Sequence, residues 1–176
     1  MSAAQDAQAA TITILGGPTA IDASSEFSGS FVAENLFNNT VTESDLGVTS
    51  YSQSGGEAYA GSGTGPFDVW MDFGSSVSAD AFAYAARAGQ GTSITVAIYF
   101  SDSDLNGTDL STLTADYSMT STDLAGNNLL DGVIRQYDFT GTEIGRYVGL
   151  RITGNGGNVG GGEFRLIAVP EPGSLA

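Results

Sequence analysis

The chain has 176 residues, with 20 acidic side chains, five arginines and no lysine, histidine or cysteine, which gives a net charge of -15. This charge repels phosphate backbones and anionic lipid headgroups, so it argues against nucleic acid as a partner. Without His and Cys, the chain has no Ser-His triad, no thiolate nucleophile, no disulfide and no imidazole metal ligand. The remaining enzymatic option is a pair of carboxylates, but no motif places two of them across a cleft. We therefore predict that the chain is not an enzyme.

The N-terminal part combines an alanine-rich tail, one strand and a long polar stretch. Residues 7–10 (AQAA) have the small-x-small pattern of a signal-peptide cleavage site, so residues 1–10 are expected to be a signal-peptide remnant or flexible tail. Residues 11–15 alternate Thr and Ile, which predicts a first strand. Residues 22–65 are rich in turn-forming residues, and we expect short strands and an ordered loop there.

Regular alternation of apolar and polar residues begins at position 67. Strands are predicted over residues 67–73, 79–86 and 92–100, with turns at 74–76 and 89–91, which is the pattern of a β-meander. Trp70 falls on the polar face of the first of these strands. We expect it to pack against the other sheet or cover an edge rather than stand exposed.

The last third of the chain begins with residues 101–128, where Asp102, Asp104, Asn106 and Asp109 suit a solvated loop or a cation site, with a helical turn nearby. Further strands are predicted over 133–139, 146–153 and 164–169, with a glycine-rich loop at 155–162. About eight short strands without helical periodicity predict an all-β fold, namely a β-sandwich jelly roll of about eight antiparallel strands. We expect a single domain over residues 11–169.

A short motif follows the last predicted strand. Residues 169–176 (VPEPGSLA) resemble the opening of a PEP-CTERM sorting signal, in which Pro-Glu-Pro precedes an apolar helix and a basic tail. The resemblance implies export to the cell surface of a Gram-negative-type bacterium, with a precursor tethered transiently to the membrane. Residues 170–176 are then the start of a truncated signal.

Four segments of the second half, in this order, carry a second resemblance: residues 69–74 (VWMDFG), 81–85 (AFAYA), 98–102 (IYFSD) and 146–152 (RYVGLRI). Together they resemble the strands of the discoidin, or coagulation-factor C-type, branch of the galactose-binding-like domains. The resemblance covers most of residues 67–169. It implies a jelly roll that binds glycans.

The same resemblance implies a calcium site at one end of the sandwich. The residues that match the family's ligand positions are Asn35, Asn38, Thr40 and Glu163. Asn38 stands where the family usually has Asp, which lowers the expected affinity because calcium prefers carboxylate ligands. The alternative is that this loop is an ordinary Asx-rich turn.

The resemblance also implies a sugar site on rim loops, where an aromatic platform stacks on the sugar and polar groups bond its hydroxyls. The candidate residues are Tyr51, Tyr59, Arg87, Asn155 and Asn158. The alternatives are structural: Arg87 neutralises an acidic neighbour such as Asp80, and the asparagines are turn residues.

The sequence thus predicts an exported, non-catalytic surface domain that binds extracellular polysaccharide or another glycan, with calcium as candidate cofactor. The alternative is a structural matrix or self-assembling protein in which the strand at 11–15 pairs with a neighbour's edge. A binder would be monomeric with a rim cleft lined by Tyr and Arg, whereas a scaffold would have its termini locked into another copy. The other arginines are each expected to pair with a carboxylate: Arg135, Arg146, Arg151 and Arg165.

Overall fold

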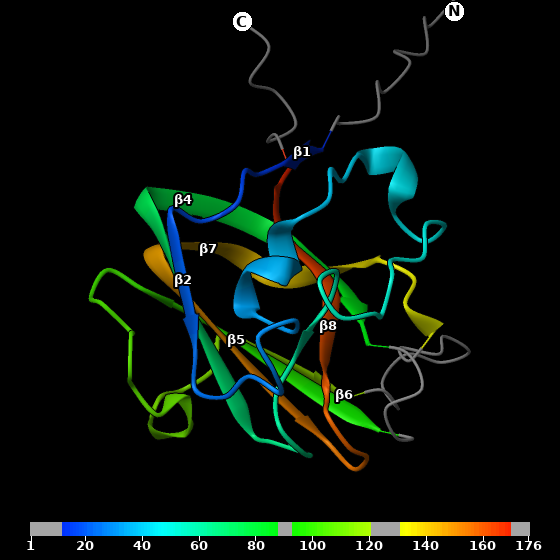
Figure 1. Ribbon diagram of the computed structural model, residues 1–176. Helices are drawn as coiled ribbons and strands as arrows, with labels where there is room; N and C mark the ends of the chain where they lie inside the picture. The colour runs from blue at the N-terminus through cyan, green and yellow to red at the C-terminus, as the bar shows by residue number, and fades with distance from the viewer. Residues whose placement is uncertain (1–11, 88–92, 121–130, 170–176) are drawn as a thin grey trace, which may run out of the picture.

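A computed structural model describes residues 12–87, 93–120 and 131–169, and the description below covers these (Figure 1). They form eight strands in one antiparallel, curled sheet, in the order β1-β8-β4-β7-β5-β6, with β2 on β4 and β3 on β8. The strands are β1 (Thr13–Ile14), β2 (Ala20–Ala23), β3 (Tyr59–Ala60), β4 (Phe67–Ala86), β5 (Ile94–Ser101), β6 (Tyr117–Thr120), β7 (Arg135–Gly154) and β8 (Gly160–Ala168). Three short 3-10 helices accompany them: η1 (Ala33–Phe37), η2 (Glu43–Asp45) and η3 (Leu110–Thr112).

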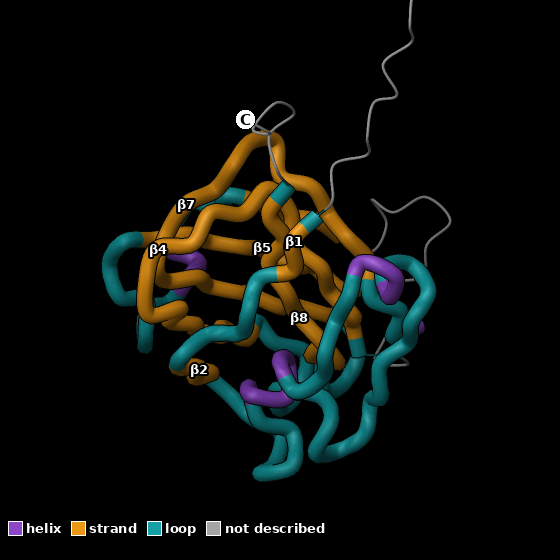
Figure 2. The backbone as a smooth tube through the Cα atoms, turned by 90° about the horizontal axis from the view of Figure 1, so that it is seen from above, coloured by secondary structure: helices purple, strands orange, loops and turns teal. Residues whose placement is uncertain are grey.

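Two long strands, β4 and β7, turn this sheet into a sandwich. They run antiparallel along most of their length, as Figures 1 and 2 show. The first half of β4 lies between β2 and the end of β7, and its second half lies between β8 and the start of β7. Register shifts at 72–77 and 79–81 bend β4 between these halves, because bulges bend a strand and increase its twist.

Two expectations about how the strands are connected are wrong. Residues 74–76 do not reverse the chain but lie within β4, where Gly74 adopts a φ of +77°. The expected β-meander is also wrong, because β7 lies between β4 and β5 in the sheet. Alternation shows which residues face inward, but it does not show which strands are neighbours.

The core between the two layers is built from the inward-facing residues of the long strands. Phe82 on β4 has four aromatic neighbours, with ring centroids 5.1–6.0 Å away: Tyr117, Tyr137, Phe139 and Phe164. Burying these apolar residues is the main favourable contribution to folding. The predicted all-β sandwich of about eight antiparallel strands is therefore confirmed.

The glycine-rich segment before the last strand differs from the expectation. Residues 160–162 belong to β8 rather than to a loop, and Gly160 pairs with Ala60 on β3. A Cβ at Gly160 would lie 2.0 Å from the carbonyl oxygen of Tyr59, so only glycine fits this close approach. No helix in the described part of the chain is long and apolar enough to span a membrane.

Candidate functional site

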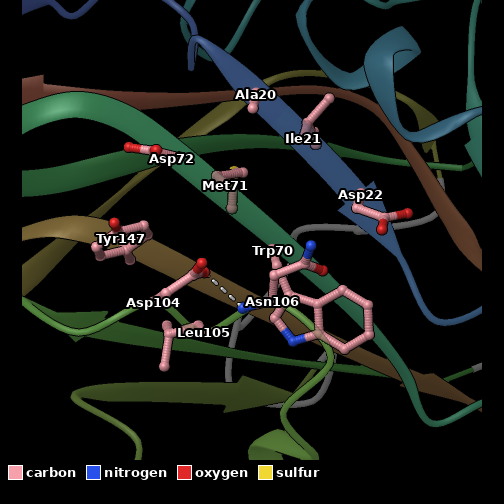
Figure 3. Close-up of a pocket in the computed structure, with 10 residues that line it drawn as sticks. All are labelled: Ala20, Ile21, Asp22, Trp70, Met71, Asp72, Asp104, Leu105, Asn106 and Tyr147. Carbon is pink, nitrogen blue, oxygen red and sulfur yellow. Dashed lines mark hydrogen bonds between the residues drawn. The ribbon is translucent and has the colours of Figure 1, made fainter.

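A pocket of about 270 Å³ opens on the outer face of the layer that contains β2, β4 and β7 (Figure 3). We call it the Trp70 pocket. Asp22 on β2 pairs with Trp70 on β4, and Asp72 two residues further pairs with Tyr147 on β7. Because side chains alternate between the faces of a sheet, this register places all four on the same outward face. The remaining lining comes from Ala20, Ile21, Met71, Asp104, Leu105 and Asn106.

The Trp70 ring lines one wall of the pocket, and contacts on its other side hold it in place. Its indole Nε1 donates a hydrogen bond of 2.9 Å to the carbonyl oxygen of Thr108. The ring packs on the small apolar cluster that includes Tyr99, Leu105 and Leu110. It therefore covers the outer face of its own sheet, while its partly exposed surface faces the pocket.

The loop that carries Leu105 and Asn106 is anchored to the sheet by an ionic network. Arg151 on β7 bonds the Asp68 carboxylate at 2.7 Å and the Asp109 carboxylate at 2.9 Å. The second Asp68 oxygen accepts a hydrogen bond from the backbone N–H of Leu110. The buried Asp68 and the partly buried Arg151 thus hold the loop in place beside the pocket.

The polar lining of the pocket is mostly acidic. Asp104 accepts a hydrogen bond of 2.9 Å from the backbone N–H of Asn106 (Figure 3), and Asp22 accepts one of 2.8 Å from the backbone N–H of Ala23. Asp72 pairs with Arg146 at 2.8 Å, and this hydrogen-bonded guanidinium holds the pKa of Asp72 down at about 2. The lining therefore presents three carboxylates and the Asn106 side chain around two aromatic rings.

The predicted sugar-site residues lie elsewhere, and the side chains of Tyr59, Arg87, Asn155 and Asn158 bond other parts of the chain. Tyr59 is fully buried, with its hydroxyl donating to the carbonyl oxygen of Ser25, and Tyr51 is 9% exposed. Arg87 donates to the carbonyl oxygen of Asn158 at 2.7 Å rather than pairing with Asp80. These contacts bring Arg87 and Asn158 together.

The two asparagines hold loops in place. The side-chain oxygen of Asn158 accepts from the backbone N–H of Gly63, and that of Asn155 accepts from the backbone N–H of Ser93. None of the five predicted residues lines the Trp70 pocket. Their role in sugar binding stays a prediction.

The predicted calcium residues also have internal partners. Asn35 is buried and donates to the carbonyl oxygens of Ser30 and Ala58. Asn38 bonds Gly56 and Asn39, whereas Thr40 is exposed. Glu163 is fully buried, and its Oε2 accepts from both the backbone and the side chain of Asn39.

The side chain of Arg165 lies among these oxygens. Its guanidinium donates to the carbonyl oxygens of Leu36 and Asn39 and forms an ion pair with Oε1 of Glu163. Burial raises the pKa of Glu163 to about 7, and the charge of Arg165 with the donors of Asn39 opposes that shift. Calcium needs six to eight oxygens at roughly 2.3–2.6 Å. As they lie, these groups do not fit it, because Glu163 is the one carboxylate among the four predicted ligands and it is already paired with the guanidinium of Arg165.

The acidic residues expected to form a solvated loop or a cation site form a loop. Within residues 12–87, 93–120 and 131–169, no three carboxylates are placed to hold a metal ion. Asp109 caps η3 through the backbone N–H of Ser111 and pairs with Arg151. The predicted helical turn near this loop is η3. The four predicted arginine–carboxylate pairs are confirmed as Arg135–Asp131, Arg146–Asp72, Arg151–Asp68 and Arg165–Glu163.

Several solved carbohydrate-binding modules share this fold. Chitosan-binding module 1 of a chitosanase/glucanase from Paenibacillus sp. IK-5 is 19% identical, with a TM-score of 0.55 over 87% of this chain and 96% of its own. The family 32 carbohydrate-binding module of AlyQ, solved with 4,5-unsaturated mannuronic acid, is 20% identical, with a TM-score of 0.57 over 86% and 95%. The chain has the fold of a carbohydrate-binding module.

A third such module, from C. perfringens NanJ and solved with galactose, is 12% identical, with a TM-score of 0.53 over 85% of this chain and 93% of its own. No protein-family profile matches the sequence, and no curated protein matches it. At these identities, the likeness establishes the shared fold, in agreement with the jelly roll that the sequence resemblance implied.

Sequence reasoning missed the Trp70 pocket as a site, although one signal for it was visible. Trp70 stands on the polar face of an alternating strand, and Tyr147 likewise alternates with the buried Val148. Two large aromatic side chains on outward faces indicate a candidate shared site, and the strand register then shows whether they lie on the same face. The register itself, which sets Asp72 opposite Tyr147, was not available from the sequence.

Proposed function

We propose that this chain is an exported, non-catalytic module that binds carbohydrate in the Trp70 pocket. The observation that carries the proposal is the pairing of two aromatic side chains, Trp70 and Tyr147, with acceptor and amide groups from Asp22, Asp104 and Asn106 around one cavity. An aromatic face packs on the apolar C–H face of a sugar ring. Carboxylates and amides accept and donate hydrogen bonds to its hydroxyls.

The size and charge of the pocket narrow the ligand. A volume of about 270 Å³ lies near the lower end of small-molecule sites, which start at roughly 300 Å³, so we expect one sugar unit of a longer chain to occupy it. The lining has three carboxylates, of which Asp72 is paired with Arg146. This charge favours neutral or amino sugars and disfavours uronic acids, because like charges repel.

The partner that we propose is an extracellular polysaccharide. The resemblance of residues 169–176 to a sorting signal supports export, but residues 170–176 and the tail at 1–11 lie outside the described residues. Similar modules solved with bound sugars add support by analogy of fold, which is weaker than support from a site.

The proposal is tested by isothermal titration of the whole chain with three oligosaccharides at equal ionic strength: chitosan, galactan and mannuronan fragments. We expect saturable binding of the amino or neutral sugar, none of the uronate, and loss of binding in Tyr147→Ala. Asp138→Asn is the matched control, because Asp138 is exposed on the half of β7 that lies in the other layer. Binding that survives in Tyr147→Ala would rule out the pocket. A lack of binding to any sugar, combined with self-association on a sizing column, would favour the structural alternative.

A further inference from the structure

Arg165 is held unlike the other paired arginines. Its side chain is 7% exposed and that of Glu163 is 0% exposed, whereas Arg146 and Asp72 are 43% and 25% exposed. The guanidinium donates to three backbone carbonyl oxygens, those of Leu36, Asn39 and Phe164. It also lies over the ring of Phe37, at 4.9 Å from the centroid.

These contacts join two segments far apart in the sequence. Leu36 and Phe37 belong to η1, Asn39 lies two residues after its end, and Glu163 and Arg165 lie on β8. Asn39 completes the link, since its side chain and backbone N–H both donate to Oε2 of Glu163. A carboxylate, loop carbonyls and a positive charge are thus assembled in one buried place.

We propose that the guanidinium of Arg165 is a built-in cation that takes the place of calcium between the 33–39 loop and β8. Loop carbonyls and a buried carboxylate converge there, and such an oxygen set needs a positive charge. Arginine supplies that charge permanently and carries five donors in a planar fork, which suits several oxygens at once. Because it is covalently attached, it needs no free ion. The loop is therefore held without calcium, whether or not the Trp70 pocket binds a glycan.

The test compares thermal unfolding in excess EDTA with unfolding in millimolar calcium, at matched ionic strength and with magnesium as a second reference. The wild-type midpoint should not change. Arg165→Ala should fold less stably and gain a calcium response of at least about 2 °C, because removing the guanidinium frees the Glu163 carboxylate and the Leu36 and Asn39 carbonyls for an ion. The double variant Arg165→Ala/Glu163→Gln should lose that response.

Two controls separate this site from the acidic surface. Arg135→Ala removes an arginine from a more exposed pair and should gain no calcium response. Arg165→Lys keeps the positive charge and should also remain insensitive to calcium. A calcium-specific rise of the wild-type midpoint that Glu163→Gln abolishes would overturn the proposal. If Arg165→Ala does not fold, the comparison of the wild type with Glu163→Gln in calcium and in EDTA is the test. A folded Arg165→Ala without any calcium response would overturn it as well.

Discussion

Two of the arginine–carboxylate pairs, Arg165–Glu163 and Arg146–Asp72, differ sharply in their exposure to solvent. Glu163 and Arg165 are buried, and Oε2 of Glu163 and the guanidinium of Arg165 also bond Leu36 and Asn39. Asp72 and Arg146 are partly exposed at the edge of the Trp70 pocket, where the carboxylate still faces solvent. The surrounding residues shield the first pair from solvent, whereas the second pair is accessible from the pocket.

The difference shows why residue type alone is a poor guide to a binding site. Asn35, Arg87, Asn158 and Glu163 have the right chemistry for ligands, but the fold supplies each with a partner from the chain. Buried polar groups must be paired, so a side chain that fits a motif is often used by the structure. The Trp70 pocket differs because its polar groups surround a cavity.

The largest expected effect comes from breaking the buried pair. Replacing Arg165 with Met leaves the fully buried Glu163 without its cation, and removing one partner of such a pair typically costs about 3–5 kcal/mol. Urea denaturation at pH 7 should show this loss in the free energy of unfolding. Arg146→Met is the matched control and should lower the free energy of unfolding much less, since exposed pairs contribute little. Equal losses in the two variants would remove the distinction between the pairs.

An intermediate effect is expected in the pocket. Asp104→Asn keeps the size of the side chain but removes its charge, and a hydrogen bond to a charged group contributes about 1.5–3 kcal/mol. We expect at least about tenfold weaker glycan binding by titration calorimetry, with an unchanged unfolding midpoint. Asp102→Asn, in the same loop but outside the pocket lining, should bind like wild type. Equal weakening in both variants would point to the charge of the whole surface instead.

The smallest effect concerns the titration of Asp72. Its pKa of about 2 lies below the ordinary value because Arg146 donates two hydrogen bonds to it. A lowered pKa in the folded state means that this pair stabilises the protein above pH 3.8, and that the contribution is lost as pH falls toward 2. Carbon-detected NMR of the Asp72 carboxyl should show titration near pH 2 in the wild type and near its ordinary value in Arg146→Gln. An unchanged titration in the variant would show that Arg146 is not the cause.

The sequence was sufficient to predict the fold class, since alternation over residues 67–73 and 146–153 marks half-buried strands. The expected arginine–carboxylate pairs are also confirmed, because each of the few arginines has many acidic residues available as partners. The connection between strands was not predictable. Bulges in β4 join two predicted strands into one, and the only sign of them in the sequence is Gly74. Local pattern sets which face is buried, whereas register and neighbours depend on distant contacts.

The site was less predictable than the fold for the same reason. Asp22, Trp70 and Asp104 are far apart in the sequence and meet only through the pairing of β2 with β4 and the anchoring of the loop between β5 and η3. For Glu163, the resemblance predicted a calcium ligand, and the structure places this residue buried beside the loop that follows η1. It did not show that Arg165, two residues later, binds the same loop.

Amide NMR mapping of this 17.9 kDa chain shows directly whether the Trp70 pocket binds the glycan. Trp70 is the only tryptophan in the sequence, so its indole N–H gives a single assigned reporter. On titration with the oligosaccharide that binds in calorimetry, we expect saturable shifts of that signal and of the amides of Asp22 and Asn106. Shifts confined to Arg87, Asn155 and Asn158, with an unmoved indole signal, would contradict this expectation and return the site to the rim loops.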